Sequence, residues 1–156
     1  MVHRNLLAAA VLLIETTSAF NVASSPPMGF NTWNNFACAG LSDVVLRRTA
    51  QALVDTGLKA AGYIFVNSDD CWMLGARDAE GNLQPNPDKF PNISDTIAFI
   101  HSLGLKSGLY TARGHNTCDG LAGACGHEAQ DAAWYASHLI DYLKDGTFLD
   151  RTGASA

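Results

Sequence analysis

Two adjacent carboxylates, Asp69 and Asp70, stand where a hydrophobic segment gives way to polar chain. Residues 63–66 before them are aromatic or β-branched, which is typical of a β-strand. Cys71 and Trp72 follow directly, and a plain solvated turn seldom carries both. Because strand ends in α/β proteins open into a crevice or a barrel mouth, the pattern predicts a functional site at this strand end.

Composition restricts the class of protein. The chain has 156 residues, enough for one modest domain, and 47% of them are hydrophobic, which is typical of a globular chain. The formal net charge is −5, which argues against nucleic acid or an anionic membrane as a partner. The sequence has neither a glycine-rich phosphate loop nor a Cys-x-x-Cys pair, and its histidines are scattered. We therefore expect no cofactor and no metal site.

The first 19 residues have the features of a secretory signal peptide. Arg4 is followed by a short apolar run over residues 6–14 and by small residues up to Ala19. The run is too short to cross a bilayer as a helix. We expect cleavage after Ala19, with Ala23 as the alternative, and a secreted, extracellular protein.

Secretion would place Cys38, Cys71, Cys118 and Cys125 in an oxidising compartment, where disulfides are expected. Four cysteines allow three pairings, and spacing alone does not choose among them. Asn92 begins an Asn-Ile-Ser glycosylation sequon after a proline-rich segment that is typical of a surface loop. We expect disulfide bonding and a glycan at Asn92.

One pattern occurs twice along the chain. A helical segment begins near Ser42 and ends at Gly57, and a second helical segment ends at Gly104. In both places Leu-Lys then carries the chain into a strand. Repeated βα units with short joints predict parallel strands with right-handed crossovers. A doubly wound sheet and a (β/α)8 barrel both fit this pattern.

Two long polar segments, 73–92 and 113–125, separate these units, and loops of this length are usually functional. A third helix is predicted after the second loop, with a small packing face made of Ala129, Ala132, Ala133 and Ala136. A fourth strand is predicted over 139–144. Residues 145–156 show no apolar period, so we place the domain at 20–144 and treat 145–156 as an unrelated polar tail.

Four motifs follow one another in register within residues 26–144. They read Pro27-Met28-Gly29-Phe30-Asn31-Thr32-Trp33-Asn34, then Asn67-Ser68-Asp69-Asp70-Cys71-Trp72, then Gly126-His127-Glu128 ahead of Gln130-Asp131-Ala132, then Asp141-Tyr142-Leu143-Lys144. Together they resemble the secreted α-galactosidases of glycoside hydrolase family 27. The resemblance implies an incomplete (β/α)8 barrel, with about the first three and a half βα units. It also implies hydrolysis of terminal α-linked galactose with retention, by two aspartates and without a metal.

The resemblance implies a role for five residues. Trp33 is expected on the floor of the pocket against the sugar, and Asp69 and Asp70 are expected to hydrogen-bond galactose hydroxyls. Tyr110 is expected to line the pocket, and Lys144 to bind the sugar. Carboxylates suit sugar hydroxyls and an indole suits the C–H face of a sugar. Core packing is the commoner role of aromatic residues near strands, so these assignments depend on the motif positions.

The resemblance also implies a disulfide between Cys38 and Cys71. The cysteine that normally pairs with the position of Cys118 is missing from this sequence. Cys118 is therefore expected either to be free or to pair with Cys125.

The sequence departs from the family immediately after Lys144. In the family this lysine is followed by Tyr and then by the nucleophilic Asp, whereas here Asp145 follows directly. A shift of one residue along a strand turns the side chain to the opposite face, so Asp145 is not assigned as the nucleophile. Asp69 and Asp70 cannot be the hydrolytic pair either, because retention needs two carboxyl groups about 5–5.5 Å apart on opposite sides of the scissile bond.

The sequence therefore predicts a chain that is an α-galactosidase by resemblance but is truncated before the catalytic aspartates and inactive. Its expected partners are α-galactoside oligosaccharides. The alternatives are an α-N-acetylgalactosaminidase fragment and a non-catalytic galactose-binding fragment. The open faces of a half-barrel also predict marginal stability or self-association.

Overall fold

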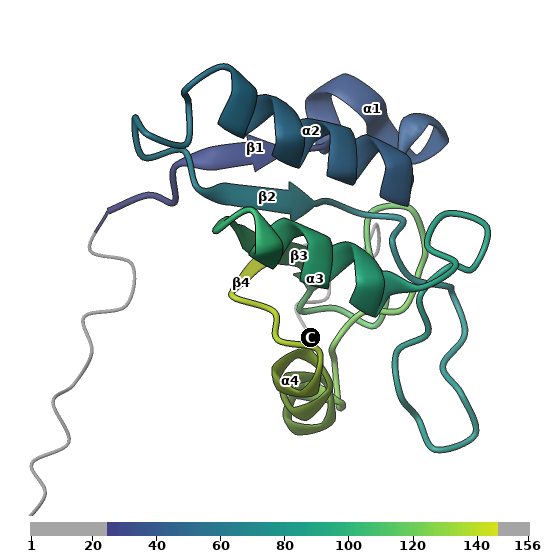
Figure 1. Cartoon of the computed structure of the whole chain (residues 1–156). Coiled ribbons are helices and arrows are strands. Elements are labelled where there is room, and N and C mark those ends of the chain that lie inside the picture. The colour runs from purple at the N-terminus through teal and green to yellow at the C-terminus, as the bar shows by residue number, and fades with distance from the viewer. Residues whose placement is uncertain (1–24, 147–156) are drawn as a thin grey trace, which may run out of the picture.

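The computed structural model describes residues 25–146; the predicted signal peptide and residues 147–156 of the predicted tail lie outside them. Four parallel strands form one sheet in chain order: β1 (Gly29–Asn31), β2 (Phe65–Ser68), β3 (Lys106–Ala112) and β4 (Tyr142–Gly146). All three strand pairings are parallel, so the four carboxyl ends point the same way, as Figure 1 shows for β1 and β2. The predicted parallel βα arrangement is confirmed.

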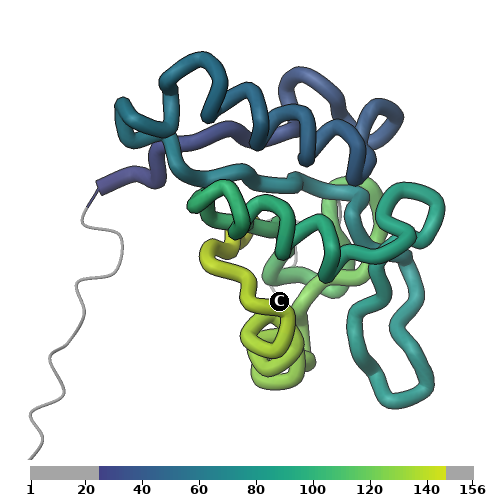
Figure 2. The backbone as a smooth tube through the Cα atoms, in the orientation of Figure 1, coloured from purple at the N-terminus to yellow at the C-terminus, as the bar shows by residue number. Residues whose placement is uncertain are grey.

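The helices alternate with these strands. They are α1 (Trp33–Gly40), α2 (Asp43–Asp55), α3 (Ile93–Ser102) and α4 (Glu128–Ser137). In Figures 1 and 2, α2 and α3 run side by side over one face of the sheet. No helix within residues 25–146 is long and apolar enough to cross a membrane.

Both predicted helix ends are confirmed. The Ser42 hydroxyl caps α2 by accepting from the Val45 N–H at 3.3 Å, and Gly57 follows the helix with φ +79°. Gly104 follows α3 with φ +65°. A glycine adopts this left-handed conformation without the steric cost that a side chain brings, so the chain can reverse toward the next strand.

Two strand boundaries differ from the prediction. The second strand begins at Phe65 rather than at residue 63, because Tyr63 is still in the turn after α2 and bonds Leu58 through its N–H. The fourth strand begins at Tyr142 rather than at 139. It continues to Gly146, so the first two residues of the predicted tail belong to β4.

The predicted alanine face of α4 is wrong. Ala129, Ala132, Ala133 and Ala136 are all exposed, and the buried residues of the helix are Asp131 and Tyr135. The Tyr135 ring packs at 6.3 Å from the fully buried Trp72 ring. An aromatic contact of this kind buries far more surface than a row of methyl groups, so it determines which face of the helix turns inward.

Leu139 is under backbone strain, because it has φ +58° and is 68% exposed. We expect Leu139→Gly to stabilise the protein by about 0.5–1 kcal/mol, since glycine adopts this conformation freely and little burial is lost. Urea unfolding followed by circular dichroism measures the change. Leu143→Gly is the control and should destabilise, because Leu143 lies within β4. Equal destabilisation by both substitutions would contradict this account.

Arg77 connects its own loop, 73–92, to the 113–125 loop and to α4. Its guanidinium donates to the Gly81 carbonyl at 2.9 Å and to the Gly123 carbonyl at 2.7 Å. It also binds both carboxylate oxygens of Asp131, at 2.6 and 2.8 Å. This side chain therefore fixes both long loops against α4.

Candidate functional site

Asp69 lies just beyond β2 and contacts its neighbour Asp70 and two residues from distant parts of the chain, Thr32 and Lys144. Its N–H donates to the Thr32 hydroxyl at 2.9 Å, and its Oδ1 accepts from the Asp70 N–H at 2.9 Å. Its Oδ2 lies 2.5 Å from Nζ of Lys144. The Asp69 side chain is 4% exposed and that of Lys144 is 42% exposed. The buried carboxylate of Asp69 thus forms an ion pair with the partly exposed ammonium group of Lys144, across the intervening strand β3.

Tyr110 lies between these two groups. It pairs in register with Lys144, whose Nζ is 5.1 Å from the centre of the tyrosine ring. Its hydroxyl lies 3.6 Å from the Cys118 sulfur. Burial, followed by the contact with Cys118, raises the pKa of Tyr110 far above its usual 10. The phenol therefore remains neutral and can act as a hydrogen-bond donor.

Trp33 is the first residue of α1, and with Lys144 it lines a cavity of about 360 Å³. Asn67 and Tyr142 also line this cavity. Gly108 is required beneath them, because a Cβ there would lie 2.1 Å from Oδ1 of Asn67. The predicted residues Trp33 and Lys144 are thus brought together, and the ion pair places Asp69 beside them.

Sequence reasoning missed Thr32, Asn67 and Tyr142 as parts of this site. Asn67 and Tyr142 precede Asp69 and Lys144 by two residues, so the period of a strand places each pair on one face. That alternation would have identified Asn67 and Tyr142 from the sequence. The contact between Thr32 and Asp69 has no comparable signal, because it joins residues 37 apart.

Asp70 has different partners from Asp69. It is 2% exposed, and its carboxylate accepts from the Cys71 N–H at 2.8 Å and from the Asp119 N–H at 3.2 Å. Burial raises the pKa of Asp70 above 3.8, although these hydrogen bonds oppose the shift. Asp70 therefore fastens the 113–125 loop to the end of β2.

The raised pKa of Asp70 predicts a pH-dependent component of stability. Because the folded state holds the proton more tightly than the unfolded state, this component is fully present below pH 3.8. It is lost as the pH rises through the raised pKa of the folded state. We expect the wild type to lose stability relative to Asp70→Asn over this interval, measured as the difference in free energy of unfolding by urea from pH 3 to 7. A difference that is constant with pH, or that moves in favour of the wild type, would refute the assignment.

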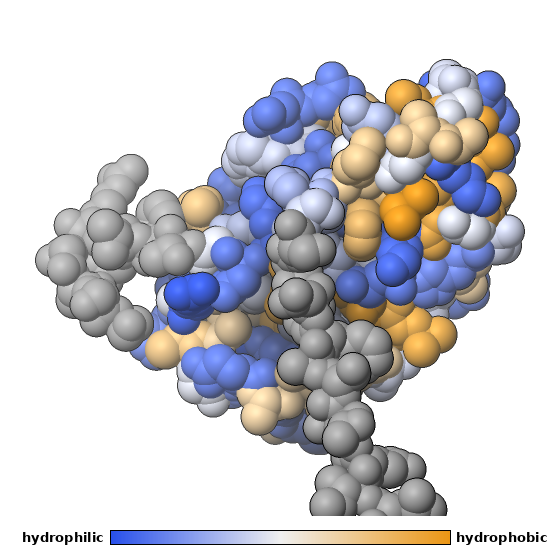
Figure 3. Space-filling view, turned by 90° about the vertical axis from the view of Figure 1, so that its left-hand side faces the viewer, coloured by the Kyte–Doolittle hydropathy of each residue, from blue (hydrophilic) through white to orange (hydrophobic). Residues whose placement is uncertain are grey.

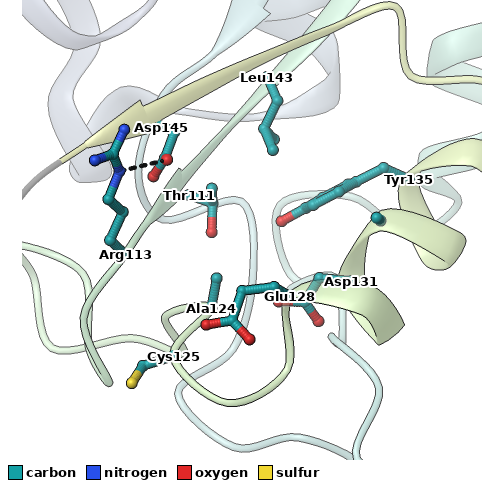
Figure 4. Close-up of a pocket in the computed structure, with 10 residues that line it drawn as sticks. Thr111, Arg113, Ala124, Cys125, Glu128, Asp131, Tyr135, Leu143 and Asp145 are labelled. Atoms are coloured by element: carbon teal, nitrogen blue, oxygen red, sulfur yellow. Dashed lines mark hydrogen bonds and ion pairs between the residues drawn. The ribbon is translucent and has the colours of Figure 1, made fainter. Parts of the chain in front are cut away.

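Asp145 lies on the other face of β4 from Lys144. It pairs with Arg113, whose Nε is 2.9 Å from Oδ2 of Asp145. Figure 4 shows Asp145 near Thr111 and on the side of the sheet that α4 covers. The predicted reversal of the side chain is confirmed, and Asp145 does not reach the cavity beside Trp33.

Cys38 and Cys71 form the disulfide that the resemblance implied. Cys118 and Cys125 are both free, so they do not pair with each other. Within residues 25–146, one group of potential metal ligands stands close together: Cys38, Cys71 and Asp119. Because its two sulfurs are joined in the disulfide, this group offers no thiolate to a metal.

The fold and the site define an α/β protein whose parallel strands follow one another in chain order, as in a (β/α)8 barrel, and which has polar and aromatic side chains at the carboxyl ends of its strands. The chain belongs to the family described as alpha galactosidase A, whose model matches residues 25–155. The family predicted from the four motifs is therefore confirmed.

Two curated relatives illustrate the similarity. The chain is 47% identical over 125 residues to an alpha-galactosidase of Cyamopsis tetragonoloba, covering 79% of this chain and 30% of that protein. It is 45% identical over 124 residues to alpha-galactosidase A of Cellvibrio japonicus, covering 79% and 30%. The chain thus spans about 30% of the length of these relatives.

Solved structures of α-galactosidases match the fold of this chain. Alpha-galactosidase I of Mortierella vinacea matches with a TM-score of 0.81 and 37% identity, over 89% of this chain and 35% of that one. The Saccharomyces cerevisiae α-galactosidase with raffinose matches with a TM-score of 0.77 and 38% identity, over 81% and 28%. The sheet of this chain accordingly matches part of a (β/α)8 barrel.

Proposed function

We propose that this chain carries the galactose-binding part of an α-galactosidase that acts on terminal α-D-galactosides. The observation that carries the proposal is the 2.5 Å pair between Asp69 and Lys144 at the strand ends, beside the cavity that Trp33 lines. The raffinose in the yeast structure supports an oligosaccharide as the substrate class.

The site chemistry suits a sugar. Asp69 would accept hydrogen bonds from galactose hydroxyls, and Lys144 and the neutral Tyr110 would donate to ring or hydroxyl oxygens. Trp33 would pack against the apolar C–H face of the ring. Asp70 would add an acceptor through the lone pairs that its backbone partners leave free.

The described residues support binding rather than cleavage. Within residues 25–146, the carboxylates at the cavity end of β2 are Asp69 and Asp70, which are adjacent in the chain and do not straddle a substrate. Asp145 is on the opposite face of the sheet. A retaining mechanism needs two carboxyl groups about 5–5.5 Å apart across the scissile bond. We therefore infer that the 156-residue chain binds galactose without hydrolysing galactosides.

Two measurements on one preparation test this proposal. We expect calorimetric titration to detect galactose binding and no binding of glucose, and 4-nitrophenyl α-galactoside to release no nitrophenol. Absence of galactose binding by the folded chain would refute the site. Nitrophenol release that disappears in an Asp69→Asn preparation would refute the binding-only role. Tighter binding of N-acetylgalactosamine than of galactose would favour an α-N-acetylgalactosaminidase.

We also propose that residues 1–19 are a signal peptide and that Asn92 carries a glycan in the secreted protein. Asn92 is exposed, and its Oδ1 caps α3 by accepting from the Asp95 N–H at 3.3 Å. Expression in a eukaryotic secretory host should give a glycosidase-sensitive mass increase. Asn92→Asp, which keeps the capping oxygen, should remove that mass without a loss of stability. An unmodified wild-type chain in the medium would contradict the glycan.

Self-association is a further part of the proposal. Within residues 25–146, β1 and β4 each have one neighbouring strand, so both are sheet edges. Figure 3 shows apolar residues interspersed with polar ones on the face seen there, and Met28, Leu58 and Tyr63 are each about 40% exposed or more. We expect light scattering to detect dimers or larger species of the isolated 156-residue chain, and a strictly monomeric chain would contradict this.

A further inference from the structure

Asn67 is a buried polar residue of β2 whose side-chain oxygen has no partner. The residue is 6% exposed, and its Oδ1 atom accepts no hydrogen bond from any described residue. Its main chain, by contrast, is paired, because its carbonyl accepts from the Thr32 N–H at 3.1 Å and its strand has a neighbour on each side. Buried polar groups in folded proteins nearly always have a hydrogen-bond partner. This carboxamide therefore needs a partner that the described chain does not supply.

Asn67 belongs to a row of residues that crosses all four strands. The register places side by side Asn31, Asn67, Gly108 and Tyr142. The Asn31 side chain is occupied, because its Oδ1 accepts from the Trp33 N–H at 3.0 Å. Gly108 has no side chain, and the Asn67 carboxamide lies over it, since a Cβ there would come within 2.1 Å of Oδ1. The row thus leaves room around the Asn67 amide without giving its oxygen a donor.

This row lies below the residues assigned to the sugar. Tyr142 precedes Lys144 by two strand residues, so the row is about 6–7 Å further from the strand ends and on the same face of the sheet. Asn67 and Tyr142 line the cavity of about 360 Å³ together with Trp33 and Lys144. A ligand held at the strand ends by Asp69 and Lys144 would therefore have Asn67 in the floor beneath it.

A sugar hydroxyl suits the free carboxamide. The amide carries a donor and an acceptor, and an alcohol hydroxyl also both donates and accepts, so the two groups can bond in either direction. A hydroxyl supplies the missing partner without bringing a further charge into a site that already holds the Asp69–Lys144 ion pair. A methylene group in the same place would leave the amide unpaired, and a site of this kind discriminates against such a ligand.

We propose that Asn67 is a sugar-binding residue that recognises the galactose hydroxyl lying deepest in the cavity, and so selects against a sugar that lacks this hydroxyl. This role rests on the proposed function, because it requires galactose in the cavity beside Trp33. The Asn67 carboxamide then serves binding rather than folding. Replacing it with an apolar group of similar shape removes a contact to the sugar and removes a buried polar group that has no partner in the described chain.

Asn67→Leu tests this role, because leucine has a similar shape and forms no hydrogen bond. We expect calorimetric titration to show galactose binding weakened by about tenfold, the loss expected for one buried hydrogen bond. The urea midpoint should equal or exceed that of the wild type. Asn35→Leu makes the same change at an exposed position of α1 outside the cavity, and should leave the affinity unchanged. Binding and stability that fall together in Asn67→Leu would show a structural role and overturn the proposal.

Monodeoxy sugars test whether a hydroxyl is the group that Asn67 recognises. The measured quantity is the ratio of the dissociation constant of each of 2-, 3-, 4- and 6-deoxygalactose to that of galactose. We expect Asn67→Leu to reduce this ratio about tenfold for one of the four derivatives and to leave it unchanged for the others. Ratios that match those of the wild type for all four would mean that the amide binds water rather than the sugar, and would overturn the proposal.

Asp69→Asn, measured beside Asn67→Leu, separates this role from the proposed function. We expect the galactose affinity to fall in both variants. A fall in Asp69→Asn with wild-type affinity in a folded Asn67→Leu protein would keep the galactose site and overturn the role of Asn67 alone. A wild-type chain that binds no galactose would overturn both.

Discussion

Asp69→Asn is expected to weaken galactose binding by about 10–100-fold, the loss that follows from removing one charge-assisted hydrogen bond. The amide keeps one acceptor oxygen for the Asp70 N–H, but it places a neutral group beside Nζ of Lys144. The ammonium then loses its partner as well as its fixed position. Isothermal titration of galactose into the wild type and the variant measures the effect.

The control for this prediction is Asp55→Asn. Asp55 is an exposed residue at the end of α2 that hydrogen-bonds Gln51, so the same chemical change occurs far from the cavity. Its galactose affinity should match that of the wild type. A small effect of Asp69→Asn, equal to that of Asp55→Asn, would show that Asp69 does not contact the sugar.

Arg77→Ala is expected to have the largest effect on stability, a loss of about 3–5 kcal/mol. The Asp131 side chain is 2% exposed and would be left as a buried charge without its partner. The Gly81 and Gly123 carbonyls would lose their donor at the same time. Thermal and urea unfolding should both show the loss, and trypsin should cut the two long loops faster.

A double substitution separates the cost of the orphaned charge from that of the missing contacts. Arg77→Met/Asp131→Leu replaces the pair with apolar groups of similar size, and this change should recover much of the stability that Arg77→Ala removes. If the double variant is as unstable as Arg77→Ala, the buried charge is not the cause. A near-neutral Arg77→Ala would refute the role of Arg77 in joining the loops.

Local sequence signals predicted much of the fold. Gly57 and Gly104 gave the ends of two helices because left-handed positions favour glycine, and this chemistry acts within a few residues. Side-chain alternation correctly placed Lys144 and Asp145 on opposite faces. Trp33 and Lys144, which the family motifs single out, line one cavity, and their contact with a sugar stays a prediction.

Contacts between distant residues could not be predicted in this way. Arg77 and Asp131 are 54 residues apart, and nothing near either residue indicates the other. The same contact, together with the packing of Tyr135 on Trp72, turned α4 away from its alanines. Long-range packing therefore decided the one helix face that periodicity assigned incorrectly.

The indole N–H resonances of this protein provide the most direct test of the sugar site. Three tryptophans give three indole signals: Trp33 at the cavity, Trp72 in the core and Trp134 packed against Trp72. During a galactose titration followed by ¹⁵N-resolved spectra, the Trp33 signal, assigned by its absence in Trp33→Phe, should move while the other two remain in place. A titration that leaves the Trp33 signal unmoved, or moves Trp72 and Trp134 instead, would contradict the proposal that the sugar packs on Trp33 beside Asp69 and Lys144.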